Sequence, residues 1–117
     1  MNVDVHALNI DRSDTLAAHV RDRISSALER FQQRVRRVRV RLSDLNGPRG
    51  GEDMMCQMQV DVMGCGLLIV EQTDTDVYHA VDQAAERVKR TVRRAINKKR
   101  DAATRNNRSA AYKAMNI

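Results

Sequence analysis

The residues most able to do chemistry in this sequence form a dense cluster of positive charge. Residues 87–100 carry eight lysines and arginines and no aspartate or glutamate. Within them Val88, Val92 and Ala95 recur at intervals of three and four residues, the spacing of one helix face. The stretch therefore predicts the basic half of an amphipathic helix, which docks through one face and offers its charge on the other to phosphates.

The bases of this stretch divide by their spacing. Arg87, Arg90 and Arg94 are three and four residues apart, so they share one helix face that points away from the valine stripe. Three further bases flank that line: Lys89, Arg93 and Lys98.

A second basic surface is predicted on a strand. Arg37, Arg39 and Arg41 alternate with Val38, Val40 and Leu42. Side chains alternate between the two faces of a strand, so one face is apolar and the other consists of arginine. Such a face cannot be buried unpaired, and it must meet solvent, acids of a neighbouring strand such as Asp61, or phosphates of a partner.

Composition indicates a polyanionic partner. The chain of 117 residues has a net charge of +6 and a pI near 10, and its positive charge is segregated along the sequence. Nucleic acid is favoured over a membrane surface, while an arginine-rich solvated surface without a partner is the plain alternative. Aromatic residues make up 3%, which argues against a surface that stacks several bases on aromatic rings.

Enzymatic chemistry finds little support in the sequence. The loop at residues 46–51 is glycine-rich but lacks the lysine and hydroxyl of a phosphate-binding P-loop. Cys56 and Cys65 have no histidines at zinc-binding spacing. The acids that could be imagined around a metal ion are Asp53, Asp61, Glu71 and Asp74, and strand alternation does not gather them. We therefore expect no enzyme activity, no cofactor and no metal site.

Hydropathy patterns predict one α+β domain followed by a tail. The expected elements are strands at 2–9, 38–42, 54–63 and 67–71, a helix at 14–33 that Ser13 caps, a tight turn at 64–66 and a helix at 76–100. The economical arrangement is a βαβββα two-layer sandwich, in which two helices pack on one face of a four-stranded mixed sheet. Its first two strands pair in parallel, and the arginines of the second strand lie on the open face. The domain covers residues 1–100, and residues 101–117 are expected to be a flexible tail or a frayed continuation of the helix.

The location of the protein is predicted from two absences. The N-terminus has no apolar signal segment, and no apolar run approaches membrane-spanning length. We therefore expect a cytoplasmic protein with reduced thiols.

Three stretches resemble the family of ribosome hibernation-promoting factors and ribosome-associated translation inhibitors. They are residues 1–10 with the helix that opens near residue 14, residues 28–31 before a valine-rich strand, and residues 76–82. In the last stretch the family has Asp-x-Tyr-x-Ala, an apolar residue and Asp, and here Asp76, Tyr78, Ala80 and Asp82 stand at those positions. The resemblance covers roughly residues 1–100.

The resemblance implies a fold similar to double-stranded-RNA-binding domains. It also implies binding to the small ribosomal subunit in the decoding channel, where messenger and transfer RNA are then excluded and translation is blocked. The family's rRNA-contacting bases fall on Arg23, Arg87, Arg90 and Arg94. Tyr78 is expected either near the RNA or, preferably, as a partly buried ring at the start of the helix.

Two hypotheses follow. The first is a hibernation factor of the short form, expected to be monomeric off the ribosome. Its tail is neither the acidic extension of some short members nor the second, dimerising domain of long members, so both ribosome pairing and inactivation of single ribosomes stay open. The second is a general RNA- or DNA-binding module that acts away from the ribosome, which the charge pattern alone allows.

Overall fold

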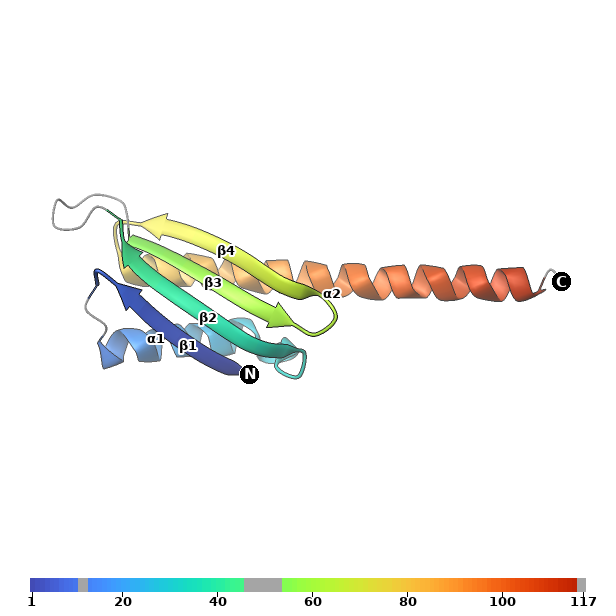
Figure 1. Cartoon of the computed structure of the whole chain (residues 1–117), viewed down its shortest axis with the longest axis horizontal. Helices are drawn as coiled ribbons and strands as arrows, with labels where there is room; N and C mark the ends of the chain where they lie inside the picture. Colours follow the sequence, from blue (N-terminus) through green and yellow to red (C-terminus); the bar gives the residue numbers. More distant parts are fainter. Residues whose placement is uncertain (11–12, 46–53, 116–117) are drawn as a thin grey trace.

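The computed structural model describes residues 1–10, 13–45 and 54–115, with side chains up to Thr104. Figure 1 shows the elements in chain order, and their order is the predicted βαβββα. They are strand β1 (Asn2–Leu8), helix α1 (Asp14–Ala27), a short 3-10 helix (Glu29–Phe31), strands β2 (Val35–Asp44), β3 (Met54–Val62) and β4 (Gly66–Asp74), and helix α2 (Val77–Met115).

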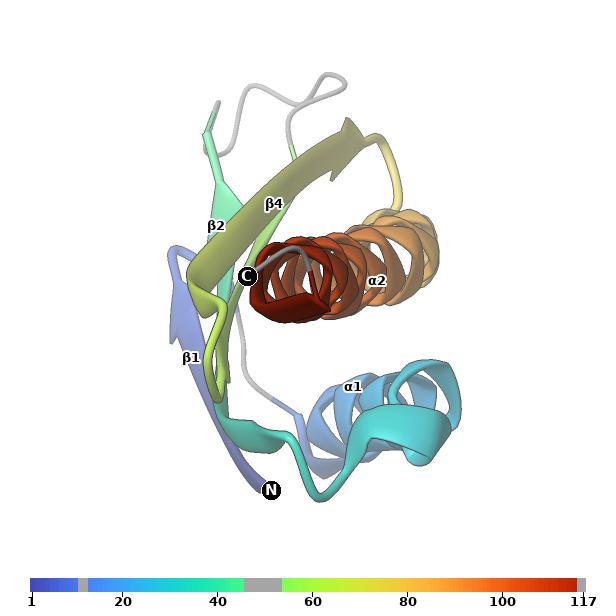
Figure 2. The same ribbon diagram turned by 90° about the vertical axis from the view of Figure 1, so that its right-hand side faces the viewer.

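The four strands form one mixed sheet in the order β1-β2-β3-β4. β1 pairs with β2 in parallel through the α1 crossover, while β2–β3 and β3–β4 are antiparallel. Both helices lie on the same side of the sheet, as the end-on view in Figure 2 shows. The predicted two-layer sandwich is therefore confirmed, and no helix or strand of the described residues covers the other face of the sheet.

Alternation along the strands decides which side chains enter the core. In β3 the buried residues are every second one, from Cys56 to Val62, and the residues between them are half-buried. β2 likewise buries Val38, Val40 and Leu42 beneath the helices, so Arg37, Arg39 and Arg41 lie on the open face as predicted. The core is aliphatic, and valines are its commonest members beside leucines, Ile24 and Met58.

Helix α1 is shorter than predicted. Ser13 caps it as expected, because its side chain accepts a hydrogen bond of 3.0 Å from the Leu16 amide. The helix ends at Ala27 instead of continuing to residue 33, since Leu28 leaves helical geometry and the 3-10 helix follows. Apolar residues keep their helical spacing up to Phe31, so the periodicity alone placed the end of α1 too late. The helix ends earlier because the chain must turn back to enter β2.

Helix α2 is longer than predicted, because it continues past residue 100 to Met115. Residues 101–115 contain no glycine or proline and several alanines, so nothing local stops the helix even though its apolar stripe has ended. Among the side chains described, which end at Thr104, the last fully buried one is Val92, and Ile96 is half-buried. Beyond it the helix extends past the end of the sheet (Figure 1) for roughly 28 Å. The flexibility of residues 101–117 stays a prediction.

The β3–β4 turn has the predicted tight geometry. Gly64 and Gly66 have φ of 80° and 82°, which a side chain would oppose, and the Cys65 amide donates to the Val62 carbonyl at 3.0 Å. Cys56 is a buried free thiol, and burial raises its pKa to about 12, so the reactive thiolate is suppressed. The glycine-rich loop at residues 46–51 lies outside the described residues.

Candidate nucleic-acid interface

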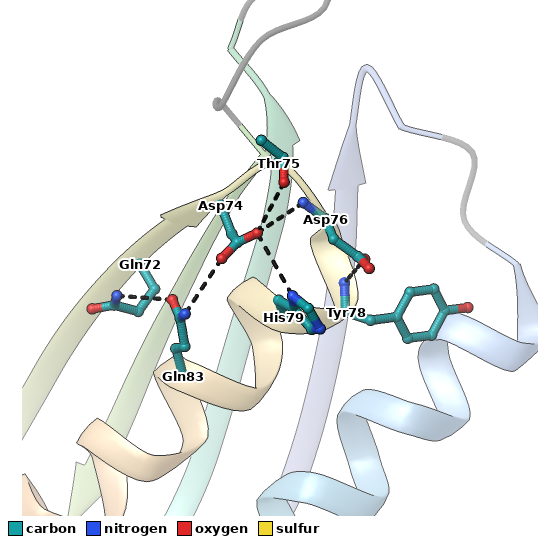
Figure 3. Close-up of polar contacts among 7 residues, drawn as sticks. All are labelled: Gln72, Asp74, Thr75, Asp76, Tyr78, His79 and Gln83. Atoms are coloured by element: carbon teal, nitrogen blue, oxygen red, sulfur yellow. Dashed lines mark hydrogen bonds and ion pairs between the residues drawn. The ribbon is translucent and has the colours of Figure 1, made fainter.

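Helix α2 is fixed at its N-terminus by two aspartates, which Figure 3 shows. Asp76 is the N-cap: its carboxylate accepts from the Tyr78 amide at 2.8 Å, and its carbonyl accepts from the Ala80 amide at 3.0 Å. Asp74, at the end of β4, accepts from the Asp76 amide at 3.0 Å and from Gln83 at 3.3 Å. The strand and the helix are thereby tied together at the point where the chain turns.

The same contacts control the charge of Asp74. The hydrogen bond from the Asp76 amide holds the pKa of Asp74 below its ordinary value, with smaller contributions from Thr75 and from His79, whose Nδ1 lies 3.9 Å away. An ionised carboxylate at this position also suits the positive end of the helix dipole.

A second set of contacts joins α1 to α2. Asp82 accepts from His19 Nε2 at 2.8 Å and from Arg23 Nε at 2.9 Å. The His19 ring meets Tyr78 edge to face, with 5.0 Å between ring centroids. Tyr78 is half-buried against the core, so the packing role preferred for it from the sequence is confirmed. Arg23 is held beside α2 by this network.

The bases of α2 fall into two rows, which lie on either side of the line of the helix that points farthest from the sheet, its exposed ridge. The first row faces β4 and we call it the β4-side stripe: Arg87, Arg90, Arg94 and Lys98. Arg87 lies 2.6 Å from both the Glu71 carbonyl and the Gln72 side chain of β4, through Nη1. Arg90 shares a surface hollow with Arg87 and Gln72, and Arg94 and Lys98 follow at intervals of four residues.

The second row faces α1 and we call it the α1-side stripe: Arg23, Lys89 and Arg93. Arg23 of α1 and Lys89 of α2 line one hollow of about 240 Å³ between the two helices. Arg93 lies one helical turn beyond Lys89 and is exposed. Tertiary structure thus brings Arg23 to bases of α2 that lie more than sixty residues away in the sequence.

Two acids separate the stripes near the start of α2. Asp82 and Glu86 line the hollows on both sides of the ridge. Beyond Glu86 the next acid is Asp101, so the bases between those two positions have no acid beside them in the sequence. Arg90, Arg93 and Arg94 occupy this part of the helix and are all exposed.

The arginines of β2 form a separate surface on the opposite side of the sheet. Cα pairing places Arg37 between Asn2 and Asp61, and its guanidinium forms an ion pair with Asp4 at 3.2 Å. Asp61 is therefore opposite an arginine, as proposed, but the ion pair lies on the β1 side. The sheet separates these arginines from both helix stripes (Figure 2), so one flat partner cannot cover both surfaces.

Sequence reasoning missed the residues that orient the basic side chains. His19, Gln72 and Gln83 are polar residues that carry no motif, and only the packing of α2 against α1 and β4 gives them partners. The acids considered as metal ligands do not gather: Asp61 and Glu71 lie on the open face, Asp74 binds the Asp76 amide before α2, and Asp53 lies outside the described residues. In the described part of the chain no group of three His, Cys, Asp or Glu side chains is placed to hold a metal ion.

Comparison with known proteins gives a family. Residues 3–100 match the model of the sigma 54 modulation protein / S30EA ribosomal protein family. The chain belongs to this family. It is the family of ribosome hibernation factors, so the resemblance seen in residues 1–10, 28–31 and 76–82 is confirmed. S30EA proteins are ribosome-associated factors that regulate translation, and the family is not a family of enzymes.

Solved structures agree with the S30EA assignment. The N-terminal domain of protein Y from Thermus thermophilus superposes with a TM-score of 0.68 at 28% identity, over 80% of this chain and 98% of that one. A ribosomal subunit interface protein from Coxiella burnetii has a TM-score of 0.67 at 11% identity, over 80% and 96% of the two chains, and supports the fold. A search of curated proteins gives no significant match. Among the described residues, no helix has the length and apolar character needed to cross a membrane.

Proposed function

We propose that this S30EA protein binds the small ribosomal subunit in the channel that messenger and transfer RNA otherwise occupy, and blocks translation sterically under stress or in stationary phase. The observation that carries the proposal is the convergence of the α1-side and β4-side stripes on one side of a ribosome-associated fold. The bases that contact rRNA are Arg23, Arg87, Lys89, Arg90, Arg93, Arg94 and Lys98.

The form of this surface suits folded RNA. Two rows of bases run along a rigid helix, so they can follow phosphates over several nucleotides without reading base identity. Stacking on aromatic rings is not needed for this mode, which depends on backbone and shape. Arg87 and Arg23 are already oriented by hydrogen bonds to β4 and Asp82, which lowers the entropy lost on binding.

The extension of α2 adds reach to this surface. Residues 101–115 continue the helix beyond the sheet and include Arg105, Arg108 and Lys113 in the sequence. We assign residues 1–100 to the ribosome-binding domain and residues 101–117 to an appended tail that follows the RNA. The protein acts as a cytoplasmic monomer before it meets the subunit, and it performs no catalysis.

The decisive experiment measures binding to isolated subunits with and without competing ligands. The protein should co-sediment with small subunits, far less with large subunits, and should be displaced when messenger RNA and initiator transfer RNA are bound first. Binding should weaken as salt rises, because each phosphate contact contributes a slope of roughly −0.7 to −0.9 in log affinity against log salt.

The alternative of a general nucleic-acid-binding module predicts another result. Free duplex RNA or DNA would then bind as tightly as small subunits at the same salt concentration. Undiminished binding to subunits that already carry messenger and transfer RNA would contradict the proposed binding site in the channel. Cryo-electron microscopy of the complex would then locate the surface that is used.

A further inference from the structure

The open face of the sheet has a hollow that takes no part in the RNA contacts proposed for the helices. On this face Arg39 lies between Asp4 and Gln59 in Cα register, and Arg41 lies between His6 and Gln57. The next outward residue of β2 is Ser43, which lies between Leu8 and Met55. The hollow of about 490 Å³ at this end of the sheet is lined by Arg39, Arg41, Ser43, His6, Leu8 and Met55, among others.

Two acids of this face are already engaged, and a third, Asp61, lies opposite Arg37 in Cα register, away from the hollow. Asp4 pairs with Arg37 at 3.2 Å, and Glu71 accepts a hydrogen bond of 2.7 Å from Gln57. Gln57 in turn accepts from Gln59 at 3.0 Å. Within residues 1–10, 13–45 and 54–104, no acid pairs with Arg39 or Arg41, so two guanidinium groups face the hollow uncompensated.

Ser43 supplies an independent observation. The residue is only 7% exposed, yet its hydroxyl has no hydrogen-bond partner in the described part of the chain. Nearly all buried polar side chains are hydrogen-bonded, so a buried hydroxyl that lines a hollow and lacks a partner points to a ligand. Ser43 follows Arg39 and Arg41 on the same side of β2, so all three converge on one space.

The remaining walls are apolar. Leu8 is 67% exposed and Met55 is half-buried, and they flank Ser43 on its two sides. A ligand for this hollow must therefore combine an oxyanion with a body that tolerates apolar contact. Arginine forks bind phosphate oxygens in a bidentate manner, and the volume lies in the usual range of roughly 300–1,000 Å³ for small-molecule sites.

We propose that the open-face hollow binds a single nucleotide. Its phosphate is held by Arg39 and Arg41, the Ser43 hydroxyl donates to a phosphate or ribose oxygen, and the sugar and base lie against Leu8 and Met55. The same chemistry is offered by a free nucleotide and by the terminal nucleotide of an RNA. The site lies across the sheet from the helix stripes and does not depend on the proposed ribosome function.

The test is a titration of the full-length ¹⁵N-labelled protein followed by NMR. The probes are adenosine 5′-monophosphate, adenosine, inorganic phosphate, and a short oligoribonucleotide with and without a 5′-phosphate. Saturable shifts of β1, β2 and β3 amides around Ser43 are expected with the monophosphate or with the phosphorylated oligonucleotide. Binding of the free monophosphate identifies a free nucleotide as a ligand, whereas binding of the phosphorylated oligonucleotide alone identifies an RNA end.

Variants connect the shifts to the named side chains. Arg41→Gln should weaken binding at least about tenfold, the loss expected when a hydrogen bond to a charged group is removed. Ser43→Ala should also weaken it, and this small change keeps the strand intact. Arg37→Gln is the matched control on the same strand face, because Arg37 is paired with Asp4 away from the hollow, and it should leave affinity unchanged.

Four results would overturn the proposal. The first three are the absence of saturable shifts with every phosphate-bearing probe, equal affinity for adenosine and its monophosphate, and equal weakening by Arg37→Gln and Arg41→Gln. Inorganic phosphate that binds as tightly as the nucleotide would also overturn it, since the apolar walls would then contribute nothing. Small-subunit binding by Arg41→Gln reports on the other side of the molecule and should stay at the wild-type level.

Discussion

The helix surface and the open face of the sheet are both basic, but they hold their arginines differently. On α2, bases recur along a rod and project outward in two stripes, with no acid between Glu86 and Asp101. On β2, Arg37, Arg39 and Arg41 each have neighbours on two adjacent strands, and one of these neighbours, Asp4, neutralises Arg37. A helix can therefore present a long row of positive charge to a polyanion, whereas neighbouring strands in a sheet divide the charge into separate local sites.

The difference shows why a count of basic residues does not identify a binding surface. Arg39 and Arg41 remain available only at one end of the open face, beside Leu8, Met55 and Ser43. On the helix, Arg90 and Arg94 are exposed along the ridge, while Arg87 is partly occupied by β4. The surroundings of each guanidinium decide whether it serves a long RNA, a single phosphate or the fold.

The largest expected effect separates the two sides of β2. Leu42→Ala should lower the free energy of unfolding by about 2–5 kcal/mol, because Leu42 is fully buried beneath the helices. Arg41→Ala, at the neighbouring exposed position, should change it by no more than about 0.5 kcal/mol. Urea denaturation followed by circular dichroism measures both, and similar losses would mean that the two faces are wrongly assigned.

A second test compares the basic surfaces directly. Arg90→Glu combined with Arg94→Glu should reduce affinity for small subunits about 100-fold, since two charge-assisted contacts of about 1.5 kcal/mol or more are lost. The salt slope should fall by roughly 2. Co-sedimentation over a salt series measures both quantities.

The matched control for this test is Arg21→Glu combined with Arg30→Glu. These exposed positions lie outside both stripes and change the net charge equally. Equal losses in the two double variants would show that total charge, and not the helix surface, determines binding.

A smaller effect concerns the anchor of the helix surface. The pKa of Asp74 is lowered in the folded state, so its stabilisation is present above the ordinary value of 3.8 and is lost as pH falls through the lowered value. Asp74→Asn keeps a hydrogen-bond acceptor but not the charge. Its Tm should therefore fall less steeply below about pH 4 than that of the wild type.

Thermal unfolding followed by circular dichroism at several pH values gives this comparison. Asp101→Asn is the control, because Asp101 is exposed beyond the last buried turn of α2. The Tm of Asp101→Asn should depend on pH as the wild-type Tm does. The same dependence for Asp74→Asn would show that the charge of Asp74 does not stabilise the fold.

The smallest effect sharpens the role of the acids between the stripes. Glu86→Gln should raise small-subunit affinity by roughly 1.4- to 5-fold, since an exposed charge interaction is worth about 0.2–1 kcal/mol. The same change at Glu29, which is exposed on the 3-10 helix away from both stripes, should have no effect. Equilibrium binding at low salt, where such effects are least screened, measures the difference.

Sequence alone determined the elements, their order and the face that each one buries. This was possible because alternation in β2 and β3 and the valine spacing of α2 are local patterns with periods of 2 and 3.6. It did not determine where the helices end. α1 stops at Ala27 because the chain must return to β2, and α2 continues to Met115 because nothing in the sequence breaks it.

Only the tertiary structure decided the partners of the charged groups. Asp82 meets His19 across 63 residues of chain, Arg87 meets the β4 backbone, and Ser43 comes to lie between Leu8 and Met55. Such contacts depend on how helices and strands are placed relative to one another, which no local period encodes. The sequence could therefore say that the protein presents arginines on a helix and on a strand, and the packing decided which of them are free to bind.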